Sequence, residues 1–139
     1  PVPTLLAVAE EARAAQGCTQ VLATLDARMD EVYTAACIWD AARQRWVPHG
    51  EVQLLAPEAV QVPAGWVLAG NAAAVYGERL APGAMQVAAL PTAAALLRLA
   101  PALLAAGAAV AADAALPLYV RDKVAQTTAE RAALKGQAA

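Results

Sequence analysis

The sequence predicts one α/β domain in which helices flank a mixed β-sheet, and the sheet begins with an antiparallel meander of three strands. Two observations favour this fold. Three β-type segments follow one another after the first helix, and from residue 66 onwards extended and helical segments alternate. A chain of 139 residues also has the usual length of a single domain with one core. Helices covering a sheet are one of the few stable ways to bury the apolar faces of both.

A helix over residues 4–16 is the first predicted element. Its apolar residues recur at helical spacing, while its charged residues, Glu10 among them, fall on another side. Thr4 is placed to cap the first turn through its hydroxyl group. Gly17 is placed to end the helix. We expect the apolar side of this helix to face the sheet.

Three strands are predicted next, over residues 20–25, 31–39 and 45–54, because these segments are rich in β-branched and aromatic residues. Short polar turns join them, so consecutive strands are expected to pair antiparallel. Trp39 and Trp46 lie on either side of the second turn. We expect the two rings to pack across it.

The second half of the chain alternates between short helices and strands. Asn71 follows a strand and a glycine, which predicts that its side chain caps the next helix. The predicted ranges are a short helix over 57–63, a strand over 66–69, a helix over 71–80, a strand over 85–89, a helix over 92–106 and an extended piece over 116–120. The leucines expected on the core face of the last helix are Leu96, Leu97, Leu99, Leu103 and Leu104. Residues 126–139 lack an apolar stripe, which predicts a frayed or disordered tail.

The charge pattern argues against direct binding to nucleic acid. The formal net charge is −2 and the basic residues are scattered, whereas nonspecific nucleic-acid binding needs clustered lysine and arginine. A membrane span is not expected either. The most apolar stretch, residues 90–112, is interrupted by Pro91, Arg98 and Pro101.

Reactive side chains are few and scattered. His49 is the only histidine and therefore cannot form a metal-binding pair with another histidine, and the sequence has no serine. Cys18 and Cys37 fit no disulfide framework, so we expect reduced, buried thiols in a cytoplasmic protein. No Gly-rich phosphate loop occurs. These features predict no cofactor, no bound metal and no enzymatic activity.

The densest polar group lies where the first predicted strand turns into the second, at Asp26, Arg28, Asp30 and Glu31. Asp26 and Arg28 could make charge-assisted hydrogen bonds to a partner, or they could fix the turn through an ion pair. Both interpretations stay open at this point.

Tyr119 and Arg121 present a similar choice. Alternation along an extended segment places both on one face, opposite Leu118 and Val120. There they could close the edge of the sheet or contact a partner, since tyrosine and arginine are enriched in interfaces and also cover cores.

Three motifs, in this order, resemble those of the TsaB/YeaZ family. The first runs over residues 21–33 and contains Asp26-Ala27-Arg28, followed by the acidic Glu31 and the aromatic Tyr33 on the next strand. The second is Gly70-Asn71, and the third is Pro117-Leu118-Tyr119-Val120-Arg121 with Val124-Ala125 behind it. In that family a strand ends in Asp-Ala-Arg, and the chain finishes with Pro-x-Tyr-x-Arg and a Val-Ala pair. The order of the motifs over nearly the whole chain makes the resemblance specific.

The resemblance implies a fold and a role. Family members have two RNase H-like, actin-like lobes of the sugar kinase and heat-shock chaperone superfamily, and residues 1–125 resemble the C-terminal lobe, with helix 4–16 linking it to a first lobe. It implies a non-catalytic scaffold in the biosynthesis of transfer-RNA threonylcarbamoyladenosine, which supports a TsaD-like catalytic subunit together with a TsaE-like ATPase and forms a homodimer in the full protein. The alternative is a small-molecule or ATP-binding enzyme, or a glycoprotease-like hydrolase, of the same superfamily. The candidate partner-contact or turn-fixing residues are Asp26, Arg28, Glu31, Tyr33, Tyr119 and Arg121.

Overall fold

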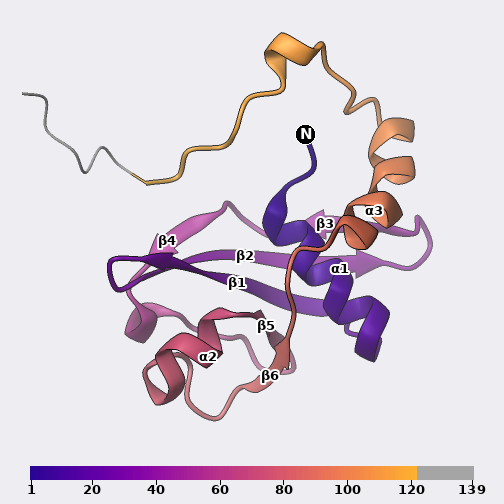
Figure 1. Cartoon of the computed structure of the whole chain (residues 1–139). Helices are drawn as coiled ribbons and strands as arrows, with labels where there is room; N and C mark the ends of the chain where they lie inside the picture. Colours follow the sequence, from indigo (N-terminus) through magenta and orange to yellow (C-terminus); the bar gives the residue numbers. More distant parts are fainter. Residues whose placement is uncertain (122–139) are drawn as a thin grey trace, which may run out of the picture.

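A six-stranded mixed sheet forms the centre of the computed structural model, which describes residues 1–121 (Figure 1). The strand order is β3-β2-β1-β5-β6, and β4 also pairs with β2. The strands are β1 (Gln20–Arg28), β2 (Glu31–Asp40), β3 (Arg45–Pro48), β4 (Gln53–Leu55), β5 (Val67–Gly70) and β6 (Met85–Ala88). The pairs of β2 with β1, β3 and β4 are antiparallel, whereas β5 runs parallel to both β1 and β6. The predicted α/β class with a mixed sheet is confirmed.

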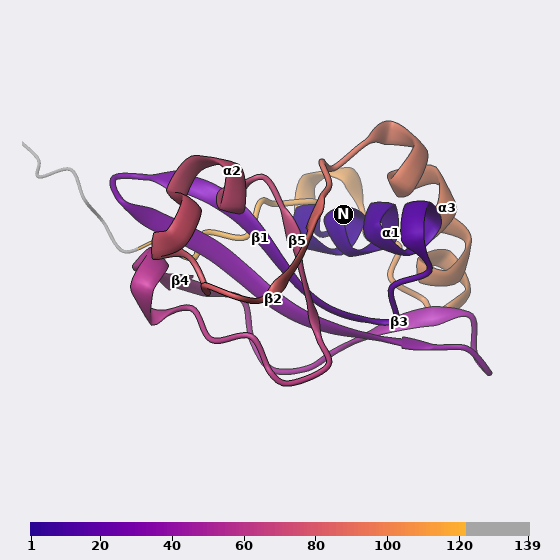
Figure 2. The same ribbon diagram turned by 90° about the horizontal axis from the view of Figure 1, so that it is seen from below.

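Helices cover both faces of this sheet. The helices are α1 (Thr4–Gln16), α2 (Ala72–Tyr76) and α3 (Ala93–Ala105). Alternate side chains of β1 enter two separate cores: Val21 and Ala23 face α1, whereas Leu22 faces α2. Helix α3 lies alongside α1, and α2 lies beside the end of the β1–β2 hairpin (Figure 2).

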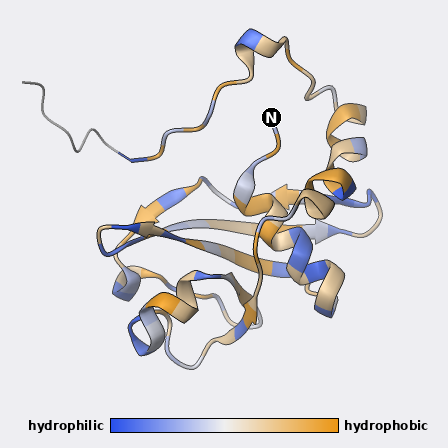
Figure 3. Cartoon of the chain, viewed as in Figure 1, coloured by the Kyte–Doolittle hydropathy of each residue, from blue (hydrophilic) through white to orange (hydrophobic). Residues whose placement is uncertain are grey.

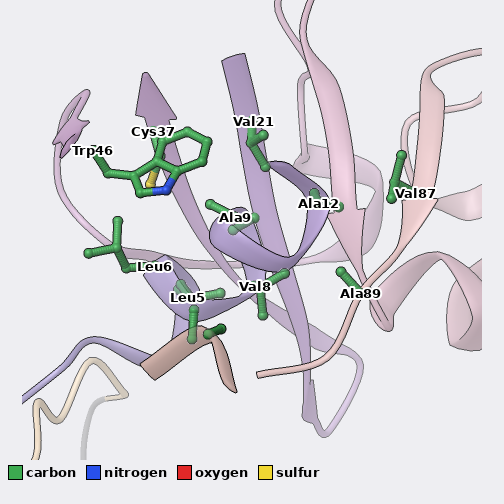
Figure 4. Close-up of a cluster of buried hydrophobic side chains, with 14 of the residues drawn as sticks. Leu5, Leu6, Val8, Ala9, Ala12, Val21, Cys37, Trp46, Val87 and Ala89 are labelled. Carbon is green, nitrogen blue, oxygen red and sulfur yellow. The ribbon is translucent and has the colours of Figure 1, made fainter. Parts of the chain in front are cut away.

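The larger core is built from the apolar side of α1 and the sheet beneath it. Figure 4 shows Leu6 and Ala9 of α1 near Cys37 and Trp46, with Val21 on β1 nearby. Several of the contributing residues are alanines, which allows the helix backbone to approach the strands closely. The apolar periodicity of residues 4–16 predicts this core. The single core expected from the length of the chain was wrong, because the other face of the sheet carries a second one.

The helix over residues 4–16 is confirmed, but two details of it were predicted wrongly. Pro3, not Thr4, occupies the cap position, and no side chain caps the first turn. Glu10 is 1% exposed, although it was expected on the polar side. Gly17 ends the helix with a left-handed backbone (φ 71°), and its amide donates to the Arg13 carbonyl.

The antiparallel meander is present, and its third strand is interrupted. Residues 45–54 form two short strands, β3 and β4, which pair with β2 at different places. Pro48 removes a backbone donor and Gly50 takes a positive φ of 92°, so the ladder cannot continue through this point. Trp39 and Trp46 are paired across the β2–β3 turn as expected, with ring centroids 5.5 Å apart in an edge-on geometry.

The two predicted helices of residues 57–80 are shorter than expected, whereas the strand predicted over 66–69 is present as β5. Residues Pro57–Ala59 form one turn of 3₁₀-helix, and α2 ends at Tyr76, after which Gly77–Arg79 form another 3₁₀ turn. Asn71 occupies the cap position of α2 but does not cap it. Its side-chain oxygen instead accepts a hydrogen bond from the Asp26 amide, 2.9 Å away, because β1 ends beside it.

Helix α3 follows β6 and begins as predicted, with the Thr92 hydroxyl accepting from the Ala95 amide. The prediction that its five leucines form a core face was wrong for three of them. Leu99 is buried and Leu103 packs against the larger core, whereas Leu96, Leu97 and Leu104 are exposed. Only the narrow line of α3 that touches α1 is covered, and much of the rest is apolar and exposed (Figure 3).

Residues 116–120 are irregular rather than a strand, and Leu118 and Tyr119 are both exposed. The expected alternation of faces is therefore wrong for this segment. The prediction for residues 126–139, and the end of the domain at residue 125, lie outside the described residues. None of the helices described is both long and apolar enough to cross a membrane.

Candidate functional site

The turn between β1 and β2 has an unusual backbone. Arg28, Met29 and Asp30 are consecutive non-glycine residues with positive φ, at 63°, 57° and 61°. Positive φ at both central residues is the geometry of a type I′ hairpin turn, which normally selects asparagine, aspartate or glycine. A left-handed conformation costs other residues about 1 kcal/mol or more each. This turn therefore persists because its surroundings hold it in place.

Asp26 fixes the start of the turn. Its Oδ1 accepts hydrogen bonds from the Arg28 amide at 2.9 Å and from the Tyr76 hydroxyl at 2.8 Å. Its Oδ2 lies 3.1 Å from the Arg28 guanidinium. The bond from the Arg28 amide and that from Tyr76 hold the pKa of Asp26 below its usual value. Burial, together with this carboxylate, raises the pKa of Tyr76. Asp26 is thus an ionised acceptor rather than a proton donor near neutral pH.

Arg79, in the 3₁₀ turn that follows α2, fixes the middle of the β1–β2 turn. Its two terminal nitrogens each lie 3.0 Å from one oxygen of Asp30, and its Nε lies 2.6 Å from Glu58. This two-pronged geometry is the strongest form of an arginine–carboxylate pair. It lowers the pKa of Asp30 and of Glu58.

Arg121 fixes the end of the turn, although it lies ninety residues further along the chain than Glu31. Its NH2 nitrogen is 2.8 Å from the Ala27 carbonyl oxygen, 3.2 Å from that of Arg28 and 2.6 Å from the Glu31 carboxylate. The first and the third of the three motifs that carry the family resemblance are therefore in direct contact.

Arg121→Ala should loosen the β1–β2 turn. The change removes donors from two backbone carbonyls and a carboxylate, so we expect the free energy of unfolding to fall by about 1–2 kcal/mol. Urea denaturation measures this loss, and hydrogen exchange should speed up at the amides of residues 27–31. Arg121→Lys, which keeps the charge but not the planar fork, is the control and should lose less. Unchanged exchange in Arg121→Ala would show that the turn does not need this contact.

The structure brings together four of the six predicted site residues. Asp26, Arg28, Glu31 and Arg121 meet at the turn, whereas Tyr33 packs against the larger core and Tyr119 is exposed. Four further residues of the same cluster were not among the predicted site residues: Asn71, Tyr76, Arg79 and Glu58. No local pattern indicates them, because they approach the turn only through the folding of β5 and α2 beside β1.

A second polar cluster surrounds the buried Glu10 of α1. The carboxylate accepts hydrogen bonds from Arg13 at 2.9 Å, from the Trp46 indole at 3.0 Å and from Arg98 of α3 at 3.0 Å. Burial raises the pKa of Glu10, but these donors outweigh it and hold the pKa below its usual value. Arg13 also stacks on Trp39, with its guanidinium carbon 4.0 Å from the ring centroid. The cluster ties α1, α3 and β3 together.

The two cysteines are free, as predicted, but only Cys37 is fully buried. Burial raises the pKa of Cys37 to about 11, so its reactive thiolate is scarce near neutral pH. We expect a maleimide to label Cys18, which is partly exposed, while Cys37 stays unmodified until the protein is unfolded. Mass spectrometry of the labelled native protein checks this. Equal labelling of both thiols would contradict the buried position of Cys37.

The cavities in residues 1–121 include two that differ in the side chains around them. The larger, of about 570 Å³, is open and lies between residues 60–66 and 81–85, just before β5 and β6. It contains no ionisable side chain, so it offers no acid or base. The smaller, of about 120 Å³, lies beside Glu10 and its arginine partners.

His49 is exposed in a loop and its ring lies 5.7 Å from that of Trp66. Residues 1–121 contain no group of three or more histidine, cysteine or acidic side chains placed to hold a metal.

The chain is similar in sequence and in fold to proteins named TsaB or YeaZ. No protein-family model matches it. The chain is 35% identical, over 135 residues, to the Escherichia coli protein named "tRNA threonylcarbamoyladenosine biosynthesis protein TsaB", a match that covers 89% of this chain and 57% of that protein.

Two solved structures share the fold. One is a Pseudomonas aeruginosa protein described as similar to peptidase YeaZ (38% identity, TM-score 0.76, covering 86% of this chain and 57% of that one). The other is YeaZ from Pseudomonas aeruginosa (39% identity, TM-score 0.75, covering 85% and 56%). The chain spans little more than half the length of these relatives. By sequence identity and by fold together, the chain is a partial match to the TsaB/YeaZ family.

Proposed function

We propose that the chain is the part of a TsaB-like subunit that supports threonylcarbamoyladenosine biosynthesis on transfer RNA as a non-catalytic scaffold. The observation that carries the proposal is the 35% identity to the E. coli protein named for this pathway, which extends over 89% of the chain. In this role the chain acts in the cytoplasm and works through a TsaD-like catalytic subunit and a TsaE-like ATPase.

The use of polar groups in the structure supports a scaffold. At the β1–β2 turn, the carboxylates of Asp26, Asp30 and Glu31 are all engaged by arginines. The buried carboxylate of Glu10 is engaged in the same way. Groups that hold backbone and helices in place through such contacts are not poised to exchange protons with a substrate.

The hydrolase alternative is not favoured. A glycoprotease-like site needs metal ligands and a base that converge on one cavity, yet the exposed His49 lies against Trp66 and the larger cavity is lined by uncharged residues. The two thiols belong to the larger core, Cys37 buried in it and Cys18 partly exposed against it, and neither lines the larger cavity.

A chimera tests the proposal, because it supplies the part of TsaB that this chain does not span. The matching stretch of E. coli TsaB is replaced by this chain, and the chimera is produced in cells depleted of their own TsaB. Threonylcarbamoyladenosine in digested transfer RNA is then measured by mass spectrometry. We expect the modification to return to near its normal level.

The controls separate folding from function. A chimera that carries Gly70→Ala, which should not fold, is expected to leave the modification absent. If the unaltered chimera is folded, as shown by its thermal transition, and the modification is still missing, the proposed function is wrong. Binding of the chimera to purified TsaD-like subunit is measured in parallel.

A further inference from the structure

Two side chains stand out at the tip of the β1–β2 hairpin. The Arg28 side chain is 86% exposed and Met29 is 68% exposed, although the backbone that carries them is among the most constrained in the chain. We propose that Arg28 and Met29 form a preorganised docking contact for a protein partner that presents a carboxylate beside an apolar recess. The proposal rests on the proposed scaffold function, because it names the kind of partner surface through which the scaffold works.

The strained backbone is the first support. Glycine at position 29 would adopt the same positive φ without the steric cost that methionine carries. The surrounding contacts offset that cost: Asp26 holds the Arg28 amide, Arg79 holds Asp30, and Arg121 holds the carbonyls of Ala27 and Arg28. Such strain is typical of functional positions. A tip held in one conformation also loses little entropy when a partner binds.

The distribution of charge is the second support. Arg79 and Arg121 are each committed to carboxylates at 2.6–3.0 Å. Arg28 has a single contact at 3.1 Å, to an aspartate that already accepts from Tyr76 and from a backbone amide. Most of the donors of the Arg28 guanidinium are therefore free for a second carboxylate, which this planar group binds in a two-pronged geometry.

The pairing of residue types is the third support. Methionine is flexible and polarisable, so it fits irregular apolar recesses, and both methionine and arginine are enriched at protein–protein interfaces. RNA fits the tip less well. Arg28 is a single exposed arginine, whereas a phosphate backbone is bound by clusters of free cations.

The test compares variants of the chimera described above. The double change Arg28→Ala and Met29→Ala removes the contact, together with the 3.1 Å ion pair to Asp26 and the 3.5 Å approach of the Arg121 guanidinium to the Met29 sulfur. It keeps the bonds from Arg79 to Asp30 and from Arg121 to the Ala27 carbonyl and to Glu31. The matched control is Arg43→Ala, which removes an exposed arginine from the β2–β3 turn, where it pairs with Asp40 at 2.8 Å. Titration calorimetry measures the affinity of each protein for purified E. coli TsaD-like subunit and TsaE-like ATPase.

We expect the double variant to bind at least one of these two partners about tenfold more weakly, as for truncated interface hot spots, while its thermal transition stays close to that of the parent. Arg43→Ala should bind as the parent does. Met29→Gly is a second probe. Glycine adopts the positive φ at position 29 without strain, so the free energy of unfolding should not fall. The turn becomes more flexible and loses the methionine side chain, so binding should still weaken.

The outcomes separate this proposal from the proposed function. If the parent chimera binds neither partner and does not restore the modification, the scaffold function itself fails, and the docking contact with it. If the parent binds and the double variant binds equally well, only the docking contact is overturned. If the double variant instead loses affinity for unmodified transfer RNA in a gel-shift assay, with protein binding intact, the tip is an RNA contact and the proposal is wrong.

Discussion

Gly70→Ala is expected to prevent stable folding. Gly70 ends β5 beside the central strand β1, with φ at 141°. A Cβ atom at this position would lie 1.7 Å from the Thr24 carbonyl oxygen, and a strand buried in the middle of the sheet cannot move away without breaking its pairing. We expect a loss of about 4 kcal/mol or more in the free energy of unfolding, out of a typical total of about 5–15 kcal/mol. Circular dichroism and urea denaturation measure it.

Gly65→Ala is the matched control for this change. Gly65 also has a positive φ, of 80°, but no atom lies within 4 Å of the position of an added Cβ. The alanine variant should therefore lose only the conformational cost of a left-handed residue, about 1 kcal/mol. Equal losses in the two variants would show that the close approach of β5 to Thr24 does not decide the stability of the sheet.

Glu10→Ala is expected to have the second largest effect. The change leaves the buried Trp46 indole without an acceptor and removes the partner that Arg13 and Arg98 share. Breaking a buried charged pair on one side costs about 3 kcal/mol, although the arginines are partly exposed and can recover some hydration. Urea denaturation measures the loss. Glu11→Ala, at the neighbouring half-buried position where the carboxylate also pairs with Arg98, should cost less than about 1 kcal/mol.

The contribution of Glu10 should also depend on pH. The folded state holds the pKa of this carboxyl below its usual value, so the unfolded chain takes up the proton first as the pH falls. The stabilisation is therefore complete above the unfolded pKa of about 4.3 and is lost as the pH falls below it. The difference in stability between the wild type and Glu10→Gln should shrink in acid. A difference that grows on acidification would contradict the assigned direction.

Most elements of this fold could be predicted from local patterns. Residues 4–16 have a clear helical period, and the β-branched residues around Val21 and Val32 mark the central hairpin. Helix α3 shows where such patterns stop being informative. It is made almost entirely of alanine and leucine, so its sequence has no polar face that would indicate which leucines are buried. Leu99 is buried and Leu97 is exposed because of how α3 packs against α1.

The residues of the candidate site were harder to predict than the helices and strands, because tertiary structure brings most of them together. Asp26, Arg28 and Glu31 are adjacent in sequence, and their clustering at a turn was predictable. Arg79 reaches Asp30 from 49 residues away, which no spacing rule indicates. Glu10 was expected at the surface because carboxylates are seldom buried. It is buried because Arg13, Trp46 and Arg98 supply donors from three different elements.

The central position of β1 has a consequence for the order in which the chain folds. Its antiparallel partner β2 follows after a two-residue turn, whereas its parallel partner β5 pairs Ala23 with Ala69 across a long intervening segment. Hairpins form within about 1–10 μs, but closing a loop of that length is slower because more chain entropy must be lost first. We expect the β1–β2 hairpin to form early. The other edge of β1 then stays unpaired until β5 pairs with it. During that interval the exposed edge is open to pairing with another molecule.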